Sequence, residues 1–398
     1  MRLTETGRLL LSLYIPTLAL NFGQGMVVPV IPTLSKSFDI SVGLAAQVVS
    51  VQLLARLLFL MPSGAIVDRW GRRPALLAGP LIIALGAVAM GLAPNFWALL
   101  GGQLISGLGT TLWQLAREIS AMDLVRQEQR GRLMSGFMGM GSVGESMGPI
   151  AGGFITDRVD FHTVFFVYAG IALVSFLVSL TVPETGKLLK GPMNLFNIGR
   201  LREVEPQYRP TYVVIVINTF VAMMRGSLRR SILPLFVVTQ LHLSSTELGV
   251  LFGVIGMVEF LMIAPTGIIS DKLGRKAAVV PSAVLGAIAF LTYPLATTMP
   301  ALIVVSAVGA VGTGLALGTM ATYTYDVIPV HARGRLQTLR RTISEFGGMS
   351  GPMMGGAVTD LISPAAAFLA FVPLQVASGA LIAFFAKETI RRPAREDA

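Results

Sequence analysis

The sequence predicts an all-α membrane protein whose twelve transmembrane helices form two pseudo-symmetric six-helix bundles. Composition points to the bilayer, because 53% of the 398 residues are hydrophobic, only 13% are charged and the mean hydropathy is +0.71. Several blocks of the first half return in the second half at one offset of 203 residues, which indicates a tandem duplication. Cations gather in alternate loops, which indicates how the helices are oriented.

Three blocks carry the duplication. The segment from Gly64 to Arg73 returns as the segment from Gly267 to Lys276, and Asp123 with its following Arg-Gly-Arg returns as Asp326. A glycine-rich block follows in each half: Gly144, Gly148, Pro149, Gly152 and Gly153 match Gly347, Gly351, Pro352, Gly355 and Gly356. One register kept across three blocks does not arise by chance, so we expect the halves to share one fold.

Long uncharged runs mark the helices, for example 75–93, 164–182, 277–296 and 365–386. A helix rises ~1.5 Å per residue and needs ~20 residues to cross ~30 Å of hydrocarbon, so each run is long enough. The runs are uniformly apolar, whereas the strands of a β-barrel alternate. The expected spans are 9–34, 43–67, 75–93, 96–122, 133–157 and 162–182, then 210–240, 245–270, 277–296, 301–326, 336–361 and 365–386.

The charged segment in the middle divides the chain. We expect an N-terminal six-helix bundle (1–182), a cytoplasmic linker (183–209), a C-terminal six-helix bundle (210–386) and a cytoplasmic tail (387–398). The linker either lies partly helical along the inner membrane face, with Leu195, Phe196 and Ile198 in the interface, or is a plain tether. The first apolar run is too long for a cleavable signal peptide and is itself expected to be a span.

Orientation follows from the 31 lysines and arginines. Only Lys36 and Arg158 fall in the loops on one side; most of the others fall in the termini, the linker and the loops on the other side. Because cations stay in the cytoplasm, we expect both termini to be cytoplasmic in a multi-pass inner-membrane protein. The net charge of +10 is therefore a topology signal, and no nucleic-acid partner is expected.

Several function classes find no support in the residues. Cysteine is absent, which excludes disulfides and thiolate chemistry. No Gly-x-x-x-x-Gly-Lys-Ser/Thr loop is present, so ATP is not expected to drive the protein. His162, His242 and His331 are dispersed and do not suggest a metal site. We expect no enzymatic activity, no cofactor and no metal.

At this point the motifs match a known family. The pattern Gly-x-x-x-Asp-Arg/Lys-x-Gly-Arg-Arg/Lys, present after spans two and eight, resembles the major facilitator superfamily of secondary transporters. The Gly-Pro-x-x-Gly-Gly block of span five resembles the antiporter motif of its drug:proton antiporter branch. The resemblance covers essentially the whole chain. It implies alternating access by rocking of the two halves about a central site.

The duplicated loop is expected to act as a breakable cytoplasmic latch. Gly64 permits close helix approach, and Asp68, one turn on, can accept hydrogen bonds from a neighbouring helix N-terminus. The resemblance implies that this neighbour is span eleven. We expect Arg72 to pair with Asp123, beside Arg117 and Glu118 in a gate network, and the second copy to repeat the arrangement. That copy comprises Gly267, Asp271, Arg275 and Asp326. Alternatively, these charges only anchor the loops at the headgroups.

The glycine-rich block of span five also has two interpretations. Gly144, Gly148, Pro149, Gly152 and Gly153, with Gly351 and Pro352 in the repeat, form a helix-packing motif. They either provide generic small-residue packing or form a bending surface that seals against the other half.

Ionisable residues inside the spans separate the cavity lining from the scaffold. Charges in hydrocarbon cost ~2.5–3.5 kcal/mol or more unless they face protein or water. Spans three, six, nine and twelve carry none in their cores, so we expect these spans to face lipid. The charges elsewhere are Arg56, Arg117, Glu118, Glu145, Arg225, Arg229, Arg230, Glu259, Arg340, Arg341 and Glu345.

Some of these are candidates for coupling and binding. Arg56 and Glu259 are mates in the repeat and are expected to face each other, while Glu345 is expected to pair with Arg341 one turn away. Each of them either handles protons or substrate or forms a structural ion pair. The proton-coupling candidates are Glu259, Glu145, Arg56 and Glu345. The substrate-binding candidates are Arg225, Arg229, Arg56, Asn21, Gln24 and Gln52, with the first two offering paired donors to an anionic group.

Two positions depart from the antiporter pattern. Span four reads Gln103-x-x-x-Gly107-x-Gly109 where antiporter relatives carry an arginine first, and span one has Asn21 and Gln24 where carriers of organic cations often place a carboxylate. The expected function is proton-coupled export of a small organic solute by a monomer in contact with membrane lipids. The alternative is an organic-anion symporter, exchanger or facilitator. A receptor or lipid scramblase is a further, less favoured class.

Overall fold

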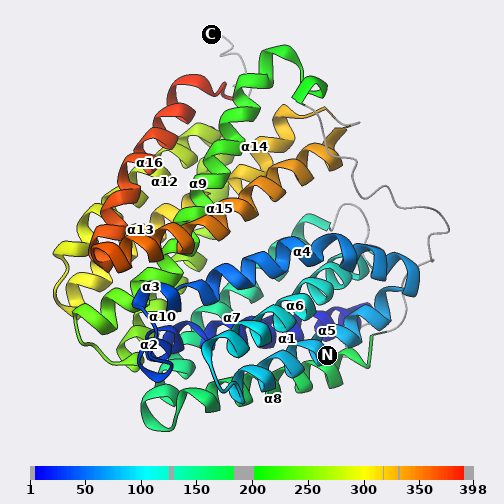
Figure 1. Ribbon diagram of the computed structural model, residues 1–398. Helices are drawn as coiled ribbons and strands as arrows, with labels where there is room; N and C mark the ends of the chain where they lie inside the picture. Colours follow the sequence, from blue (N-terminus) through cyan, green and yellow to red (C-terminus); the bar gives the residue numbers. More distant parts are fainter. Residues whose placement is uncertain (1–4, 125–129, 183–200, 317, 330–331, 390–398) are drawn as a thin grey trace.

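The computed structural model describes residues 5–124, 130–182, 201–316, 318–329 and 332–389. Within some described helices the side chains are not described, among them those of Asp68 and Asp123. The described part of the chain is helical and contains no strand, and it forms two bundles, α1–α8 and α9–α16 (Figure 1). The fold class expected from composition and the repeat is confirmed.

The first bundle contains six spans, two of which are built from more than one helical piece. The pieces are α1 (Glu5–Met26), η1 (Val28–Val30), α2 (Ile31–Ser37), α3 (Val42–Ala45), α4 (Gln47–Trp70), α5 (Arg72–Gly91), α6 (Phe96–Leu124), α7 (Arg130–Arg158) and α8 (Phe161–Ser179).

The second bundle repeats this plan. It contains α9 (Arg209–Leu235) with η5 (Phe236–Gln240), α10 (Ser245–Leu261), α11 (Ile263–Lys272), α12 (Arg275–Thr292) with η6 (Tyr293–Leu295), α13 (Met299–Ala316), α14 (Thr319–Val327), α15 (Arg333–Leu361) and α16 (Pro364–Phe385). Two 3-10 turns, η3 (Leu201–Glu203) and η4 (Pro206–Tyr208), precede it. The part of the linker that was expected to be helical, including Leu195, lies outside the described residues.

Four expected spans are interrupted, and span two is one of them, because α3 ends at Ala45 and α4 begins at Gln47. Span one breaks after Met26, where Pro29 and Pro32 lack the backbone donor that an uninterrupted helix uses. Span ten breaks at Gly318, whose φ of 77° is a left-handed conformation that glycine adopts without strain. Span eight breaks at Met262, and Thr266 in the following piece donates to Gly314 O at 3.0 Å, which ties α11 to α13. The expectation of continuous helices was wrong at these points.

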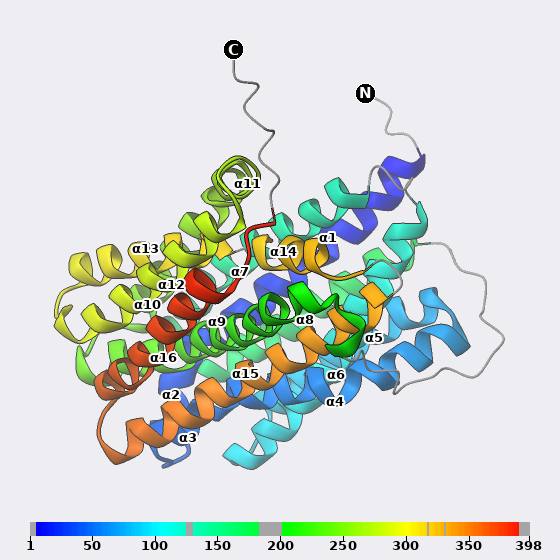
Figure 2. The ribbon, with the colours of Figure 1, turned by 90° about the horizontal axis from the view of Figure 1, so that it is seen from above.

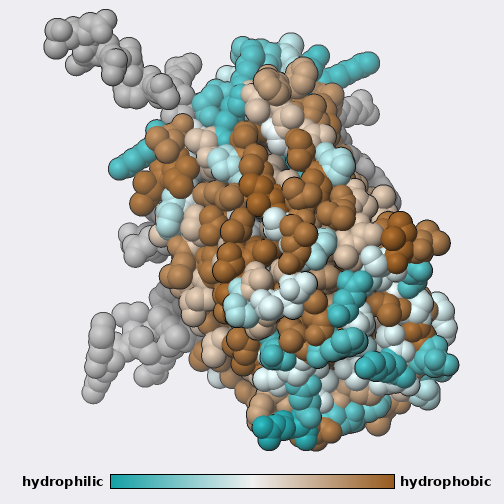
Figure 3. Space-filling model, turned by 90° about the vertical axis from the view of Figure 1, so that its left-hand side faces the viewer, coloured by the Kyte–Doolittle hydropathy of each residue, from teal (hydrophilic) through white to brown (hydrophobic). Residues whose placement is uncertain are grey.

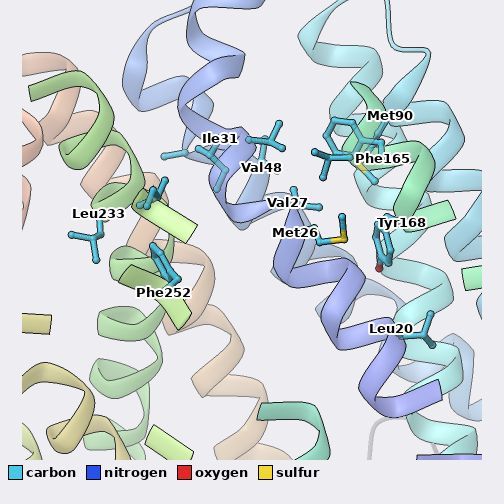
Figure 4. Packing of buried hydrophobic residues seen from close by; sticks show 14 of the residues in the cluster. Leu20, Met26, Val27, Ile31, Val48, Met90, Phe165, Tyr168, Leu233 and Phe252 are labelled. Carbon is cyan, nitrogen blue, oxygen red and sulfur yellow. The ribbon is translucent and has the colours of Figure 1, made fainter. Parts of the chain in front are cut away.

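Helices within each bundle pack closely through small residues. A Cβ on Gly86 of α5 would lie 2.5 Å from Ser106 N of α6, so glycine is needed at that crossing. Around the break after α1, the side chains of Met26 and Val27 pack toward Tyr168 and Phe165 of α8 (Figure 4). The two bundles meet at the end of the molecule that carries α2, α3 and α10 and diverge toward the other end (Figure 1), and they overlap in the view from above (Figure 2).

The outer surface is suited to lipid. Large hydrophobic side chains are exposed on α5, α8, α12 and α16, for example Leu85, Leu177, Leu291 and Phe384. These are spans three, six, nine and twelve, and other spans also expose hydrophobic side chains, for example Phe154 of α7 and Met257 of α10. Hydrophobic side chains dominate the centre of the face in Figure 3, and hydrophilic ones gather toward its lower right.

Length and hydropathy identify nine membrane-spanning helices among the described residues. The other three spans are α6, α7 and α15, each 29 residues long. At ~1.5 Å per residue, each is longer than the bilayer's hydrocarbon is thick. The protein is therefore a multi-pass membrane protein with twelve spans.

Candidate functional site

The two bundles meet along two crossings related by the repeat. Helix α7 of the first bundle packs on α10 of the second, and α15 of the second packs on α3 and α4 of the first. Glycines bring these backbones together, because a Cβ on Gly153 would overlap Ser245 O and one on Gly249 would overlap Pro149 O. In the other crossing, Gln47 Nε2 donates to Pro352 O at 3.3 Å and Ser50 Oγ donates to Met349 O at 3.3 Å.

At one end of each crossing, a carboxylate of one helix accepts hydrogen bonds from the N-terminus of the helix in the other bundle. Asp157, near the end of α7, accepts hydrogen bonds from Ser245 N (3.1 Å), Thr246 N (2.6 Å) and Thr246 Oγ1 (2.7 Å) at the start of α10. An anion at a helix N-terminus is stabilised both by the free backbone donors and by the helix dipole. We call this contact the Asp157 clasp.

The repeat produces a second clasp in the opposite direction. Asp360, near the end of α15, accepts from Ser41 Oγ (2.7 Å) and Gly43 N (2.7 Å) at the start of α3. Asp360 is the mate of Asp157, and Ser41 is the mate of Ser244, the N-cap of α10. Each bundle therefore holds the other through the same chemistry at the same end of the molecule.

Four charged side chains meet deeper along the α7–α10 crossing. Arg230 of α9 pairs with Glu145 of α7 at 2.6 Å, and Arg229 of α9 pairs with Glu259 of α10 at 2.5 Å. All four line one pocket, part of which is open to solvent. The Arg230–Glu145 pair joins the bundles and is 46% and 41% exposed, whereas Arg229 and Glu259 are 7% and 18% exposed. We call these residues the central charge cluster.

The expected facing of Arg56 and Glu259 is not found. Arg56 of α4 instead lies 3.6 Å from Glu345 of α15, because α4 packs on α15 and α10 packs on α7. The expected pairing of Glu345 with Arg341 is also wrong among the described side chains. The Arg56–Glu345 contact crosses between bundles, as the Arg230–Glu145 pair does.

Arg225 and Arg229 do not present their donors to a common position. Arg229 is held by Glu259 and lies 3.5 Å from Thr313 Oγ1, whereas Arg225 donates to Ser282 O at 2.9 Å within the second bundle. The two side chains leave the same helix toward different neighbours. In this conformation the two arginines are therefore not placed to bind one anionic group together, as was expected.

The polar candidates of the first bundle come partly together. Gln24 and Gln52 line one small pocket together with Gln103 and Tyr168, and part of it is open to solvent. Asn21 instead donates to Thr17 O at 2.7 Å and lies beside Gly141 of α7. The pocket offers amide and hydroxyl groups with no formal charge among its lining residues.

Arg117 is buried in the first bundle. Its guanidinium lies 3.2 Å from Thr17 Oγ1 and 3.4 Å from Glu118, and it stacks 5.0 Å from the Trp113 ring centre and 4.7 Å from that of Phe137. Aromatic faces stabilise a cation that has been removed from water. The environment ties Arg117 to α1 and α7 within its own bundle, and a gate role for it stays a prediction.

The residues of the second copy of the expected latch are all described, and Arg275 forms the expected pair with Asp326. Arg275 lies 3.0 Å from Asp326 and 2.7 Å from Asp271, and it also donates to Ser270 Oγ at 2.8 Å. Asp271 is nevertheless 73% exposed, and a Cβ on Gly267 would meet nothing within 4 Å. No close helix approach exists at Gly267 in this conformation.

The first copy is only partly described. Gly64 lies in α4 and Arg72 begins α5, but the side chains of Asp68 and Asp123 lie outside the described part. The proposed seal between Asp68 and span eleven, and the Arg72–Asp123 pair, therefore stay predictions.

The glycine-rich motifs serve both packing and the contact between bundles. A Cβ on Gly144, Gly148 or Gly152 would overlap the backbone of α1, while Gly153 and the carbonyl oxygen of Pro149 face α10. The repeat behaves alike, with Gly351 against α9 and Pro352 O accepting from α4. The two interpretations of this block thus apply to opposite faces of one helix.

Sequence reasoning missed three elements of the site. Asp157 and Asp360 are mates in the repeat but were not predicted as site residues, although Ser41 and Ser244, which are also mates, signalled two N-caps that could receive them. Arg230 was not selected, because its neighbour Arg229 lay on the face shared with Arg225. Among the described residues no group of three His, Cys, Asp or Glu side chains is placed to hold a metal.

Comparison with known proteins agrees with this architecture. The profile of the Major Facilitator Superfamily matches residues 13–206 and 215–398. The tetracycline resistance protein, class B, of Escherichia coli is 26% identical, with 85% of each chain covered. The multidrug resistance protein MdtH of Aeromonas salmonicida (strain A449) is 25% identical, with 83% of each covered.

Solved structures share the fold at lower identity. A D-xylose-proton symporter superposes with a TM-score of 0.79 at 15% identity, covering 96% of this chain and 98% of the other. A peptide transporter in complex with sulfate gives 0.79 at 14% identity, covering 94% and 93%. The family match spans nearly the whole chain, so this protein belongs to the Major Facilitator Superfamily and is a membrane transporter, not an enzyme.

Proposed function

We propose that the protein exports a small organic solute across the cytoplasmic membrane in exchange for protons. The observation that carries the proposal is the central charge cluster, in which two glutamates are each paired with an arginine of α9. Similarity to proteins named for tetracycline and multidrug resistance supports export as the direction. The domain limits and the orientation of both termini toward the cytoplasm form part of the same proposal.

The cluster suggests how a proton changes the contact between bundles. Ionised Glu145 binds Arg230 across the α7–α10 crossing, and its protonation removes the charge that holds the pair together. Because this pair is nearly half exposed, water can deliver protons to it. Glu259 is more buried and pairs with Arg229, the residue before Arg230 in the chain. Because both pairs line one pocket, protonation of either glutamate changes the net charge of that pocket.

Alternating access supplies the second half of the mechanism. Both clasps lie at one end of the molecule and are formed, whereas α11, which carries Asp271 at the other end, makes no close approach at Gly267. By the distribution of cations, the clasped end faces outward. The conformation thus corresponds to a carrier closed to the outside, and export requires the clasps to open.

The test uses purified protein in proteoliposomes with imposed pH and voltage gradients and a panel of anionic, zwitterionic and cationic solutes. Glu259→Gln and Glu145→Gln are expected to abolish accumulation driven by a pH gradient while solute exchange continues. Glu205→Gln, at an exposed carboxylate outside the spans, is the matched control and is expected to behave as wild type. If both cluster variants still accumulate solute against its gradient, the protons are coupled elsewhere or the protein is a facilitator.

A further inference from the structure

Three glutamine side chains of the first bundle line one small pocket, which adjoins the central charge cluster. Gln24 lies on α1, Gln52 on α4 and Gln103 on α6, and Tyr168 of α8 lies with them. Val28 of η1 lines both this pocket and the pocket of the cluster. A solute bound in one of them is therefore close to the other. We call the pocket around these four polar side chains the amide pocket.

The contact between α4 and α6 brings two of the glutamines together. A Cβ on Gly107 of α6 would overlap Cβ of Ala55 in α4, so glycine permits the close approach of the two helices. Gln103 lies one turn before Gly107, and Gln52 lies one turn before Ala55. Because residues one turn apart share a helix face, the contact that joins α4 and α6 also places both glutamines at the pocket.

The contact between α1 and α8 supplies a further wall. A Cβ on Gly23 of α1 would overlap the ring of Tyr168, and Gln24 follows Gly23 directly. Helix α1 ends two residues later at Met26, and Val27 in the break after it also lines the pocket. Figure 4 shows Tyr168 beside this break. The interruption of span one therefore lies at the amide pocket.

The amides of the pocket lack partners within the protein. Gln103 is only 6% exposed, and none of the three glutamine side chains forms a hydrogen bond in the described part of the chain. Buried amides nearly always find partners, and each amide group both donates and accepts. The free space holds about two water-sized groups, which is enough for the polar head of a solute but not for a whole organic molecule.

The pocket is also free of charge. Its lining contains no ionisable side chain except the hydroxyl of Tyr168, and Arg56, one turn beyond Gln52 on α4, lies 3.6 Å from Glu345 of α15. An ionic head would lose its hydration here without meeting a countercharge, which is strongly unfavourable. A neutral head that both donates and accepts hydrogen bonds would replace the water at no such cost.

We propose that the amide pocket binds an uncharged head of the transported solute, a carboxamide or ureide group. Such a head carries a donor beside an acceptor, which matches the amides of Gln24, Gln52 and Gln103. The rest of the solute would then extend past Val28 toward the central charge cluster. The proposal rests on the proposed function, since it concerns the exported solute, but it assigns the preference for a neutral head to residues that take no part in proton coupling.

The test compares three probes that share a benzene ring and differ in the head: benzamide, benzoate and benzylammonium. Binding to the purified full chain in lipid nanodiscs is measured at equilibrium by saturation-transfer difference NMR, and empty nanodiscs give the contribution of the lipid. Benzamide is expected to bind roughly tenfold more tightly than either ion, because only the ions lose hydration without a countercharge. An ion that binds as tightly as benzamide, or the absence of benzamide binding, would overturn the proposal.

Variants assign the preference to the pocket. Gln103→Leu removes the buried amide with little change in size and is expected to weaken benzamide binding roughly tenfold. Gln52→Glu places a carboxylate at a partly exposed position and is expected to make benzylammonium the tighter ligand. Gln375→Leu, the same change at a buried glutamine of α16 outside the pocket, is the control and is expected to keep the wild-type preference. A wild-type preference in Gln52→Glu contradicts the proposal even if Gln103→Leu does not fold.

Failure of this proposal and failure of proton coupling give different results. Accumulation that persists in both Glu259→Gln and Glu145→Gln would refute coupling through the central charge cluster, and the preference for benzamide would remain. Loss of that preference while both cluster variants abolish accumulation would refute the amide pocket alone.

Discussion

Loss of the clasps should shift the protein toward an outward-open conformation. Asp157→Asn keeps the side-chain shape but replaces an anion that accepts three hydrogen bonds at the start of α10 with a neutral amide. Asp360→Asn does the same to an anion that accepts two at the start of α3. The steps of the transport cycle that require the outward end to be closed are then expected to be slower.

The magnitude follows from the hydrogen bonds. Bonds to a charged group contribute about 1 kcal/mol more than neutral ones, and an exposed anion at a helix N-terminus gains a further ~0.3–1 kcal/mol. Both carboxylates are solvent-exposed, so screening keeps the net loss near about 1 kcal/mol per clasp, or roughly fivefold in the conformational equilibrium. The clasps share no residue, so the double variant is expected to reach about 2 kcal/mol, or roughly thirtyfold.

Pulsed electron–electron double resonance between two spin labels can measure the populations of the two conformations. The chain contains no cysteine, so spin labels attach only at Ser37→Cys and Gln240→Cys, two exposed positions of opposite bundles at the clasped end. The population of the longer distance is expected to increase in each single variant and further in the double variant. Asp160→Asn removes a nearby carboxylate that makes no cap hydrogen bond and is the control. A double variant with the wild-type distance distribution would refute the role assigned to the clasps.

Two further predictions concern the contact between the bundles. Gly249→Ala places a methyl group against Pro149 O and should reduce the transport rate at least tenfold. The control Gly226→Ala, with open space around the new methyl group, should leave the rate within about twofold of wild type. Equal rates in the two variants would show that transport does not need the close approach of α7 and α10. Arg56→Glu and Glu345→Arg should each lower Tm, and the variant with both changes should restore it. The interaction energy between the two positions is expected to be about 0.5–3 kcal/mol. If the two single losses simply add in the double variant, the 3.6 Å contact contributes nothing to stability.

The fold could be predicted because the bilayer requires long apolar helices and places cations in the cytoplasmic loops, and both patterns are visible in the sequence. Uncharged runs near 20 residues long, the loop cations and the 203-residue repeat gave the spans to within several residues. Interruptions were harder to predict. Pro29 and Gly318 are visible in the sequence, but prolines such as Pro149 and Pro352 lie within unbroken helices, so residue type alone does not decide where a span breaks.

The pairing of charges could not be predicted from the repeat. Arg56 and Glu259 are mates by offset, yet the bundles meet through α7 with α10 and α15 with α4, which gives each a different partner. Helical spacing placed Arg225 and Arg229 on one face, but long side chains diverge, and each was drawn to a different neighbour on α12 or α10. Which helices cross at the interface decides these contacts, and that information lies in tertiary packing.

The most direct test of the account follows protons and solute together. Proteoliposomes that contain the wild-type protein and an enclosed pH indicator would receive a solute gradient without any imposed pH difference. Downhill movement of solute is expected to drive protons in the opposite direction, and this proton movement should vanish in Glu259→Gln while solute exchange persists. Solute movement with no accompanying change in enclosed pH, or the same pH change in wild type and Glu259→Gln, would contradict proton exchange through the central charge cluster.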